Sequence, residues 1–159
     1  MVLVVEHSEE GALGIVLNRP SEVAARDALP DPLGAALAED DLLHHGGPVE
    51  PGSVIVLADF ADGDLSAGLA FDHVGVVDPD GDLDALAETV RAVRAFSGYA
   101  GWAAGQLEAE IGQDAWIDAP AGAADVFTAE PGALWSSVLE RKGGSYRLVA
   151  RMPEDPALN

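Results

Sequence analysis

Short apolar runs, and alternations of apolar with polar residues, predict β-strands in the first part of the chain. Residues 2–5 form a continuous apolar run, which is typical of a strand covered on both faces. Further along, Leu13, Ile15 and Leu17 occupy every second position, and the segment 8–12 before them contains a glycine suited to a tight turn. The start of the chain therefore predicts a β-hairpin.

The same reasoning predicts the elements in the rest of the chain. Residues 21–31 contain a proline and small polar residues, which predict a loop. Apolar and β-branched stretches predict strands at the start of 42–52 and over 53–58, 73–77, 90–98, 115–120 and 145–152. Helical spacing and terminal signals predict short helices over 32–39, 83–88, 101–111 and 131–142, a turn or short helix at 123–128, and a polar tail over 153–159.

Two of these boundaries depend on particular residues. Asp31 is predicted to cap a helix that begins at Pro32, because a short polar side chain before a proline is a common helix start. Val90 continues the helical spacing of Leu83 and Leu86, yet the stretch from Val90 can also be interpreted as a strand. We place the end of the helix before Val90.

Together these elements predict an α+β fold, with a mixed sheet or sheets and several short helices packed on them. A length of 159 residues is that of one ordinary domain, so we expect a single compact domain over 1–159. Hydrophobic residues make up 48% of the chain, but aromatic residues only 6%. We therefore expect a core that depends on valine and leucine, with few large side chains.

Charge narrows the classes of partner. The chain has 28 acidic against 8 basic residues, a formal net charge of −20. Because nucleic-acid affinity rests largely on lysine and arginine contacts to phosphates, we expect no direct nucleic-acid binding. Half of the basic residues do lie near the C-terminus, at Arg141, Lys142, Arg147 and Arg151, but no recognised DNA-binding motif accompanies them. We interpret the high negative charge as a feature that keeps the protein in solution.

Cysteine usage and hydropathy exclude further classes. The chain has no cysteine, which excludes disulfides, thiolate catalysis and thiolate ligation of iron–sulfur clusters. The start of the sequence has no basic segment typical of a secretory signal, and no stretch approaches the roughly 20 apolar residues of a membrane span. We therefore expect a cytoplasmic protein that does not enter membranes.

Three segments carry a family likeness. They are 4–20, with Glu-His before a hairpin, 45–57, with a Gly-Gly-Pro turn, and 98–121, with GYAGW followed by GQLE. In this order and spacing the chain resembles the YqgE/AlgH family of bacterial proteins, and 125–135 continues the likeness more weakly. The resemblance implies a family without an agreed reaction, some of whose members are described as transcriptional regulators.

The chain departs from the family pattern at its start. Family members usually carry an additional strand and loop before the segment that begins here at Met1. The resemblance thus leaves open whether the natural protein extends further upstream. If that strand is absent, its apolar neighbour in the sheet lacks a hydrogen-bonding partner, which favours association with other chains.

The glycine-aromatic block supplies most of the candidate ligand-binding residues. Gly98, Gly101 and Gly105 surround a predicted strand-to-helix turn, which could direct N–H groups at an anion or let the helix pack closely on the sheet. Helical spacing predicts that Trp102, Gln106 and Glu110 share one helix face. These side chains could contact a ligand, or Trp102 could instead cap the core while Gln106 satisfies a buried backbone group. The candidates are Asn18, Gly46, Gly47, Tyr99, Gly101, Trp102, Gln106 and Glu110.

Metal and catalytic motifs are incomplete. His7, His44 and His45 lack a metal-binding spacing, and adjacent histidines in a strand point to opposite faces. The aspartates from Asp78 to Asp84 lack the glycine and glutamate positions of a calcium loop, and favour a loop and a helix cap. The serines lie outside any G-x-S-x-G motif. We expect no metal and no cofactor.

The leading functional hypothesis is a non-enzymatic cytoplasmic protein that acts by binding or regulation, with an unidentified protein or small molecule as partner. One alternative is an enzyme that acts on a small molecule near residues 98–110. Another is indirect transcriptional regulation. A deep pocket that includes Trp102, Gln106, Asn18 and the glycines would favour a small molecule, whereas a flat apolar patch would favour a protein partner.

Overall fold

The fold is organised around one long strand in the centre of the sheet. The computed structural model describes residues 1–29, 31–61 and 66–152. They form an eight-stranded sheet whose strands are β1 (Val2–Ser8), β2 (Gly11–Val16), β3 (Pro20–Ala24), β4 (Leu42–His45), β5 (Val49–Asp59), β6 (Ser66–Phe71), β7 (Val74–Val77) and β8 (Ala92–Ala103). The main path of the sheet runs β1-β2-β8-β5-β7-β6, and β4 joins β3 to β8.

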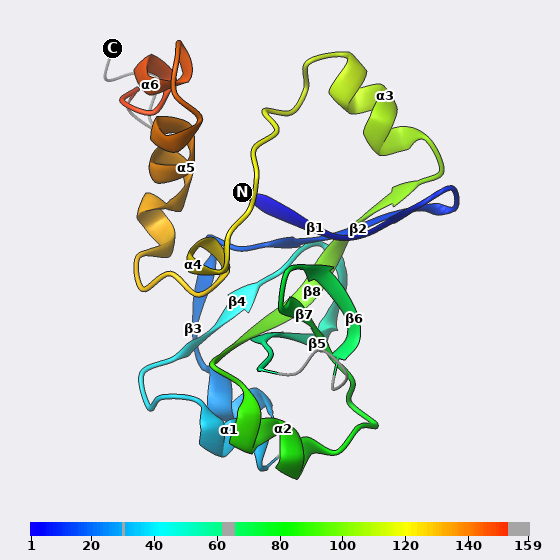
Figure 1. The fold of residues 1–159 in the computed structure, drawn as a ribbon, viewed down its shortest axis with the longest axis vertical. Coiled ribbons are helices and arrows are strands. Elements are labelled where there is room, and N and C mark those ends of the chain that lie inside the picture. The colour runs from blue at the N-terminus through cyan, green and yellow to red at the C-terminus, as the bar shows by residue number, and fades with distance from the viewer. Residues whose placement is uncertain (30, 62–65, 153–159) are drawn as a thin grey trace.

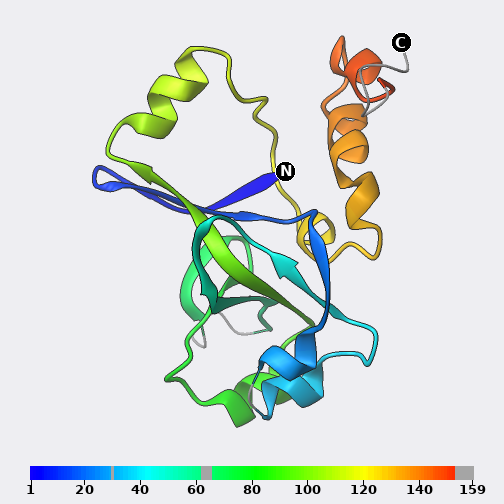
Figure 2. The same cartoon turned by 180° about the vertical axis from the view of Figure 1, so that it is seen from behind.

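Strand β8 holds the sheet together because it pairs with three other strands. Its end from Ala100 to Ala103 pairs with β2, and the stretch from Ala92 to Tyr99 pairs with β5, both antiparallel. The short parallel pairing with β4 involves Phe96 and Ser97, which also pair with β5. The sheet is mostly antiparallel and nearly closed, and the twisted strands wrap around a common interior (Figures 1 and 2).

Short helices lie around the sheet. They are α1 (Leu33–Ala36), α2 (Leu83–Thr89), α3 (Gln106–Gly112), α4 (Ala123–Val126), α5 (Leu134–Lys142) and α6 (Tyr146–Val149), with 3-10 turns at Ala25–Ala28 and Pro131–Ala133. Helices α1 and α2 lie together at one end of the molecule, and α3, α5 and α6 at the other (Figure 1). The prediction of an α+β fold with a mixed sheet and several short helices is confirmed.

The core consists of two clusters on opposite sides of β5. Leu57 faces one cluster, while Val56 and Ala58 face the other, as the alternation of side chains along a strand requires. Phe96 on β8 is fully buried in the first cluster and Phe60 in the second. The remaining buried members are aliphatic, so the expected valine and leucine core is confirmed.

Several predicted elements are confirmed. The hairpin at the start is β1 and β2, and the predicted strands at 53–58 and 73–77 lie within or coincide closely with β5 and β7. Asp82 caps α2 by accepting a hydrogen bond from the Ala85 N–H at 3.0 Å, as the aspartate run indicated. The long C-terminal helix prediction corresponds to α5, preceded by a 3-10 turn.

Other predictions were wrong because tertiary pairing outweighs the local pattern. The predicted loop at 21–31 begins instead with the end of strand β3, which pairs with β4, and strand β6, which pairs with β7, has no counterpart among the predicted elements. The helix predicted over 101–111 begins only at Gln106, because the preceding residues pair with β2. Asp31 makes no cap to α1, whose N-cap is Pro32.

Two predicted strands near the C-terminus are also absent. Residues 115–120 have no regular structure, and two of their carbonyl groups accept hydrogen bonds from side chains: Lys142 donates to the Asp118 carbonyl and Arg141 to that of Pro120. The strand predicted at 145–152 is instead α6, which follows a turn and packs on α5. The predicted polar tail at 153–159 and Pro30 lie outside the described residues.

The buried ring at the centre of β8 provides a test of this core. Phe96→Ala is expected to lower the free energy of unfolding by about 3–5 kcal/mol, since it removes a fully buried ring and leaves a cavity. Leu69→Ala, on β6 and 46% exposed, is expected to change it by less than about 0.5 kcal/mol. Urea denaturation measures both values, and equal losses would contradict this assignment of the core.

Candidate functional site

An apolar groove lies beside strand β1. Its volume is about 340 Å³. Strand β1 contributes Val2, Leu3 and Val4, and β6 contributes Ala70 and Phe71. The remaining lining includes Leu17, Trp102, Leu107, Ile111, the segment 116–121, Asp125 and Val138. We call this cavity the β1 groove.

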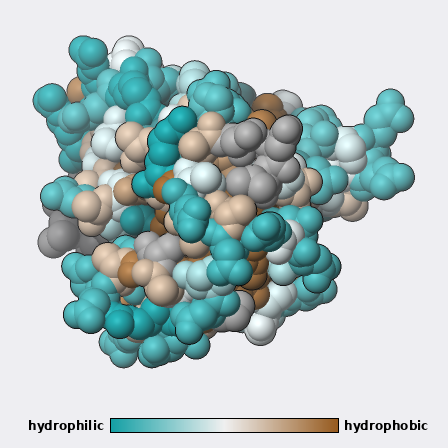
Figure 3. Space-filling view, turned by 60° about the horizontal axis from the view of Figure 1, so that its bottom comes forward, coloured by the Kyte–Doolittle hydropathy of each residue, from teal (hydrophilic) through white to brown (hydrophobic). Residues whose placement is uncertain are grey.

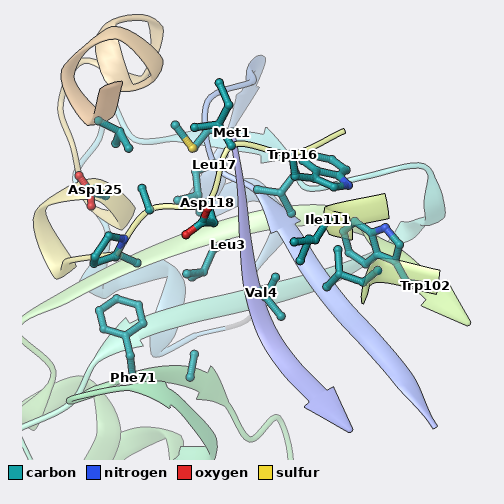
Figure 4. A pocket seen from close by; sticks show the side chains of 18 residues that line it. Met1, Leu3, Val4, Leu17, Phe71, Trp102, Ile111, Trp116, Asp118 and Asp125 are labelled. Atoms are coloured by element: carbon teal, nitrogen blue, oxygen red, sulfur yellow. The ribbon is translucent and has the colours of Figure 1, made fainter. Parts of the chain in front are cut away.

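One wall of the β1 groove stands away from the sheet. It consists of α3 and the irregular segment that leads to α4, residues 106–122, which we call the flap (Figures 1 and 2). Leu107 is buried, but Ile111, Trp116 and Ile117 are 46%, 40% and 45% exposed. Figure 4 shows Trp102, Ile111 and Trp116 near one end of the groove and Phe71 and Asp125 toward the other. The flap thus carries large apolar side chains that the protein itself does not cover.

Glu110 fixes the shape of the flap. Its carboxylate accepts hydrogen bonds from the indole N–H groups of Trp102 and Trp116, at 3.1 and 2.8 Å, and from the Gln106 amide at 2.9 Å. The Gln106 carbonyl oxygen in turn accepts the N–H of Ala103 at 3.1 Å. The two indoles lie edge to face, 6.0 Å apart. Glu110 therefore links β8, α3 and the segment after α3.

These contacts also determine the protonation of Glu110. Hydrogen bonds from Trp116, Gln106 and Trp102 stabilise the ionised carboxylate and hold the pKa of Glu110 below its usual range. At neutral pH the group is therefore an anionic anchor and has no proton to donate. A second link to α3 is the His7 Nε2 contact with Glu108 Oε1, at 2.6 Å, in which both side chains are about half exposed.

The structure does not bring all the predicted ligand-binding residues together at one site. Trp102, Gln106 and Glu110 do contact one another, although Trp102 lies on β8 and not on a shared helix face. Of these, Trp102 lines the β1 groove. Asn18 lies beyond the end of β2, where its side-chain oxygen accepts a hydrogen bond from the Met1 amino group at 2.7 Å. A ligand-binding role for these residues stays a prediction.

The glycines of the Gly-Gly-Pro turn allow the backbone of this turn to lie very close to that of β8. A Cβ on Gly46 would lie 2.3 Å from the Gly98 carbonyl oxygen, and one on Gly47 only 2.1 Å from the Tyr99 carbonyl carbon. Gly98 itself has φ +67°, a conformation that favours glycine. Gly101 lies within β8 opposite Leu13. The predicted turn from strand to helix therefore comes later, at Gly105.

The histidines and serines lie outside the β1 groove. His44 is buried, with its ring 5.6 Å from that of Phe96, whereas His45 is exposed, as expected for neighbours in a strand. His45 Nδ1 lies 3.5 Å from the hydroxyl of Ser97. Within residues 1–29, 31–61 and 66–152, no three acidic, histidine or cysteine side chains are grouped so that they could hold a metal ion.

Sequence reasoning missed the segment after α3. Trp116 completes the Glu110 cluster, and Trp116, Ile117 and Phe71 form much of the groove wall. The signal is a tryptophan and an isoleucine close behind a predicted amphipathic helix, in a segment for which the pattern predicts a strand. In this structure the same residues follow an irregular path and expose one side.

The fold and the groove define a class of protein: a small α+β domain with a nearly closed, mostly antiparallel sheet and an apolar groove under a flap. The family model described as AlgH-like matches residues 1–147. The chain therefore belongs to the AlgH-like family, and the predicted resemblance is confirmed.

Relatives and solved structures agree with this assignment. A UPF0301 protein of Thermobifida fusca is 41% identical over 170 residues, covering 100% of this chain and 85% of the relative. The crystal structure of a Corynebacterium diphtheriae protein has a TM-score of 0.82 at 28% identity, covering 95% of this chain and 81% of that one. The solution structure of the AlgH protein from Pseudomonas aeruginosa has a TM-score of 0.68 at 30% identity, covering 97% and 84%.

The contact between the Gly-Gly-Pro turn and β8 gives a second test. Gly46→Ala is expected to lower the free energy of unfolding by about 1–3 kcal/mol, since the added methyl group would overlap the Gly98 carbonyl. Gly52→Ala is the matched control, because a Cβ there would have no heavy atom within 4 Å. Thermal unfolding of both variants measures the difference. Two equally stable variants would show that the backbones can separate without cost.

Buried His44 gives a third test, through pH. Burial lowers the pKa of His44, and the positive charge of Arg94 lowers it further. Its Nδ1–H donates to the Leu42 carbonyl at 3.0 Å, and Nε2 is buried without a hydrogen-bond partner, so the neutral ring is favoured. The folded state therefore binds this proton more weakly than the unfolded chain.

The stability that depends on neutral His44 is present above about pH 6.5 and is lost as the pH falls below that value toward the lowered pKa. Urea denaturation between about pH 7.5 and 5 is expected to show this loss. His44→Phe should flatten the pH dependence, while His45→Phe, at the exposed neighbour, should retain it. An unchanged slope in His44→Phe would exclude His44 as the cause.

Proposed function

We propose that this protein acts by binding an apolar partner in the β1 groove and that it does not catalyse a reaction. The observation that carries the proposal is the groove itself, with apolar walls from β1 and β6 and the indoles of Trp102 and Trp116 at one end. Tryptophans are frequent anchors of binding surfaces, and an exposed apolar cavity favours a partner that covers it.

The polar groups around the groove support binding over catalysis. Asp125 accepts two hydrogen bonds from the Arg141 guanidinium, at 2.9 and 2.6 Å. Burial works to raise the pKa of Asp125, but these bonds outweigh burial and the pKa lies below its usual value. Glu110 is likewise engaged by three donors. Both carboxylates therefore act as anionic anchors of the fold.

The surface at the opposite end of the molecule differs from the groove. The face around α1 and α2 is mostly hydrophilic, and its hydrophobic side chains show between polar ones in small groups (Figure 3). Among the described residues no helix is long and apolar enough to cross a membrane. We propose a cytoplasmic location, and any effect on transcription would be indirect, since a net charge of −20 opposes direct contact with nucleic acid.

An apolar fluorescent probe tests whether the groove binds. Nile red, an uncharged apolar dye, is expected to gain fluorescence in the presence of the protein. Val4→Arg places a charge in the groove and is expected to weaken binding by about tenfold, through the loss of apolar contact. Val23→Arg is the matched control, since this valine is similarly exposed but lies on β3, outside the groove.

Fluorescence titration gives the dissociation constant for each variant. Thermal unfolding shows whether both variants remain folded. Equal weakening by Val4→Arg and Val23→Arg, or no binding by the parent protein, would contradict the proposal.

A further inference from the structure

The basic residues of this acidic chain are concentrated in its last two helices. Helices α5 and α6 and the turn after them, residues 134–152, contain four of the eight basic residues and only one acidic residue, Glu140. We call this segment the arm. It stands beside the sheet, and α6 lies at the end of the arm that is farther from the strands (Figures 1 and 2). A strongly acidic protein thus carries one locally basic segment.

The four cations of the arm fall into two pairs with different surroundings. Arg141 and Lys142, at the end of α5, donate hydrogen bonds to groups of residues 118–125 and so hold the arm against the rest of the fold. The other two are Arg147 and Arg151. Among the described residues Arg147 forms no ion pair, and Arg151 reaches only the glutamate of α5, with 4.0 Å between its Nε and the carboxylate oxygen. Both guanidinium groups are therefore accessible to an anionic partner.

Beside these arginines lie the two most exposed large apolar side chains of the described residues. Leu148 is 72% exposed and Met152 57%, whereas the others reach at most 49%. The N–H groups of Arg151 and Met152 donate to carbonyls three residues back, so the chain keeps turning beyond the end of α6. Leu148 and Met152 are therefore about one turn apart, with the arginines next to them. We call Arg147, Leu148, Arg151 and Met152 the arm patch.

We propose that the arm patch binds an acidic, amphipathic helical segment of a partner protein, with two apolar residues one turn apart and acidic residues beside them. The apolar residues of the segment cover Leu148 and Met152, which the protein itself leaves exposed. Its carboxylates meet the guanidinium groups of Arg147 and Arg151. This site is separate from the proposed binding in the β1 groove, because the arm patch shares no residue with the groove lining.

The size of the basic region favours a short segment over an extended polyanion. The formal net charge of −20 repels anions at long range, but at physiological ionic strength the field of exposed charges decays over about 8 Å. A short acidic segment can contact the end of the arm alone. A nucleic acid or an anionic membrane would also lie against the acidic remainder of the protein, which opposes its binding.

Charge also disfavours a second copy of the chain as the occupant. In a two-fold interface the same patch meets itself, so the arginines of one copy would face those of the other. The net charge of −20 on each copy adds further repulsion. A segment with the opposite charge avoids both costs.

A synthetic helical peptide tests the proposal, with two leucines one turn apart among glutamates. Fluorescence anisotropy measures its affinity for the full chain, and NMR of labelled methyl groups locates the contact. We expect the methyl signals of Leu148 and Met152 to shift, and the affinity to fall as salt is added. Absence of binding, or binding that leaves these two signals unchanged, would overturn the proposal.

Two substitutions separate the charge of the arm patch from its apolar contact. Arg147→Gln is expected to weaken peptide binding about two- to fivefold through the loss of a surface ion pair, and Leu148→Ser by about tenfold or more through the loss of apolar contact. The matched controls are Arg26→Gln and Leu42→Ser, at exposed positions outside the arm, and both should retain binding. Thermal unfolding shows whether all four variants remain folded. Equal weakening by a substitution and its control would contradict the assignment of the site.

Other occupants would give different results. If a peptide with glutamines in place of its glutamates binds equally well, charge does not select the partner and the proposal is wrong. It is also wrong if a DNA duplex or a phosphatidylglycerol vesicle binds the arm patch more tightly than the peptide, or if sedimentation shows a dimer that Leu148→Ser dissociates. Nile red should not displace the peptide, because the two bind at different surfaces. The proposed function and this inference can therefore fail independently.

Discussion

The architecture depends on the close contact between the backbone of the Gly-Gly-Pro turn and that of β8. At Gly46 and Gly98 the two chains approach so closely that no side chain fits between them. This approach lets β8 pair with β4 on one side and still continue to its ladder with β2. Phe96, which is fully buried, lies on β8 where the strand pairs with both β4 and β5.

From this contact the position of the groove follows. Strand β8 holds Trp102 opposite Ala12 in the ladder with β2, and the turn at Gly105, with φ +72°, redirects the chain into α3. Glu110 then ties α3 back to Trp102 and holds Trp116 beside it. The flap is thereby fixed by polar contacts at one end, so that its apolar side chains can face the groove without being packed on the sheet.

The sequence predicted the strands and helices whose patterns are local, such as the hairpin, β5, α2 and α5. It could not predict β3 or β6, because their residues are polar or small and become strands only through partners such as β4 and β7. The helical spacing of Trp102, Gln106 and Glu110 predicted correctly that these side chains lie together. They meet although Trp102 is on β8, because the tight turn at Gly105 brings the end of β8 next to α3. Trp116 was missed, because an irregular segment has no period from which its contacts could be inferred.

The acidity of the chain bears on the same groove. Val2, Leu3 and Val4 line it without a charged side chain, so electrostatic repulsion between identical molecules at this surface has to come from the rest of the protein. A formal net charge of −20 supplies that repulsion at long range. The same charge opposes contact with nucleic acid and favours partners of the opposite sign.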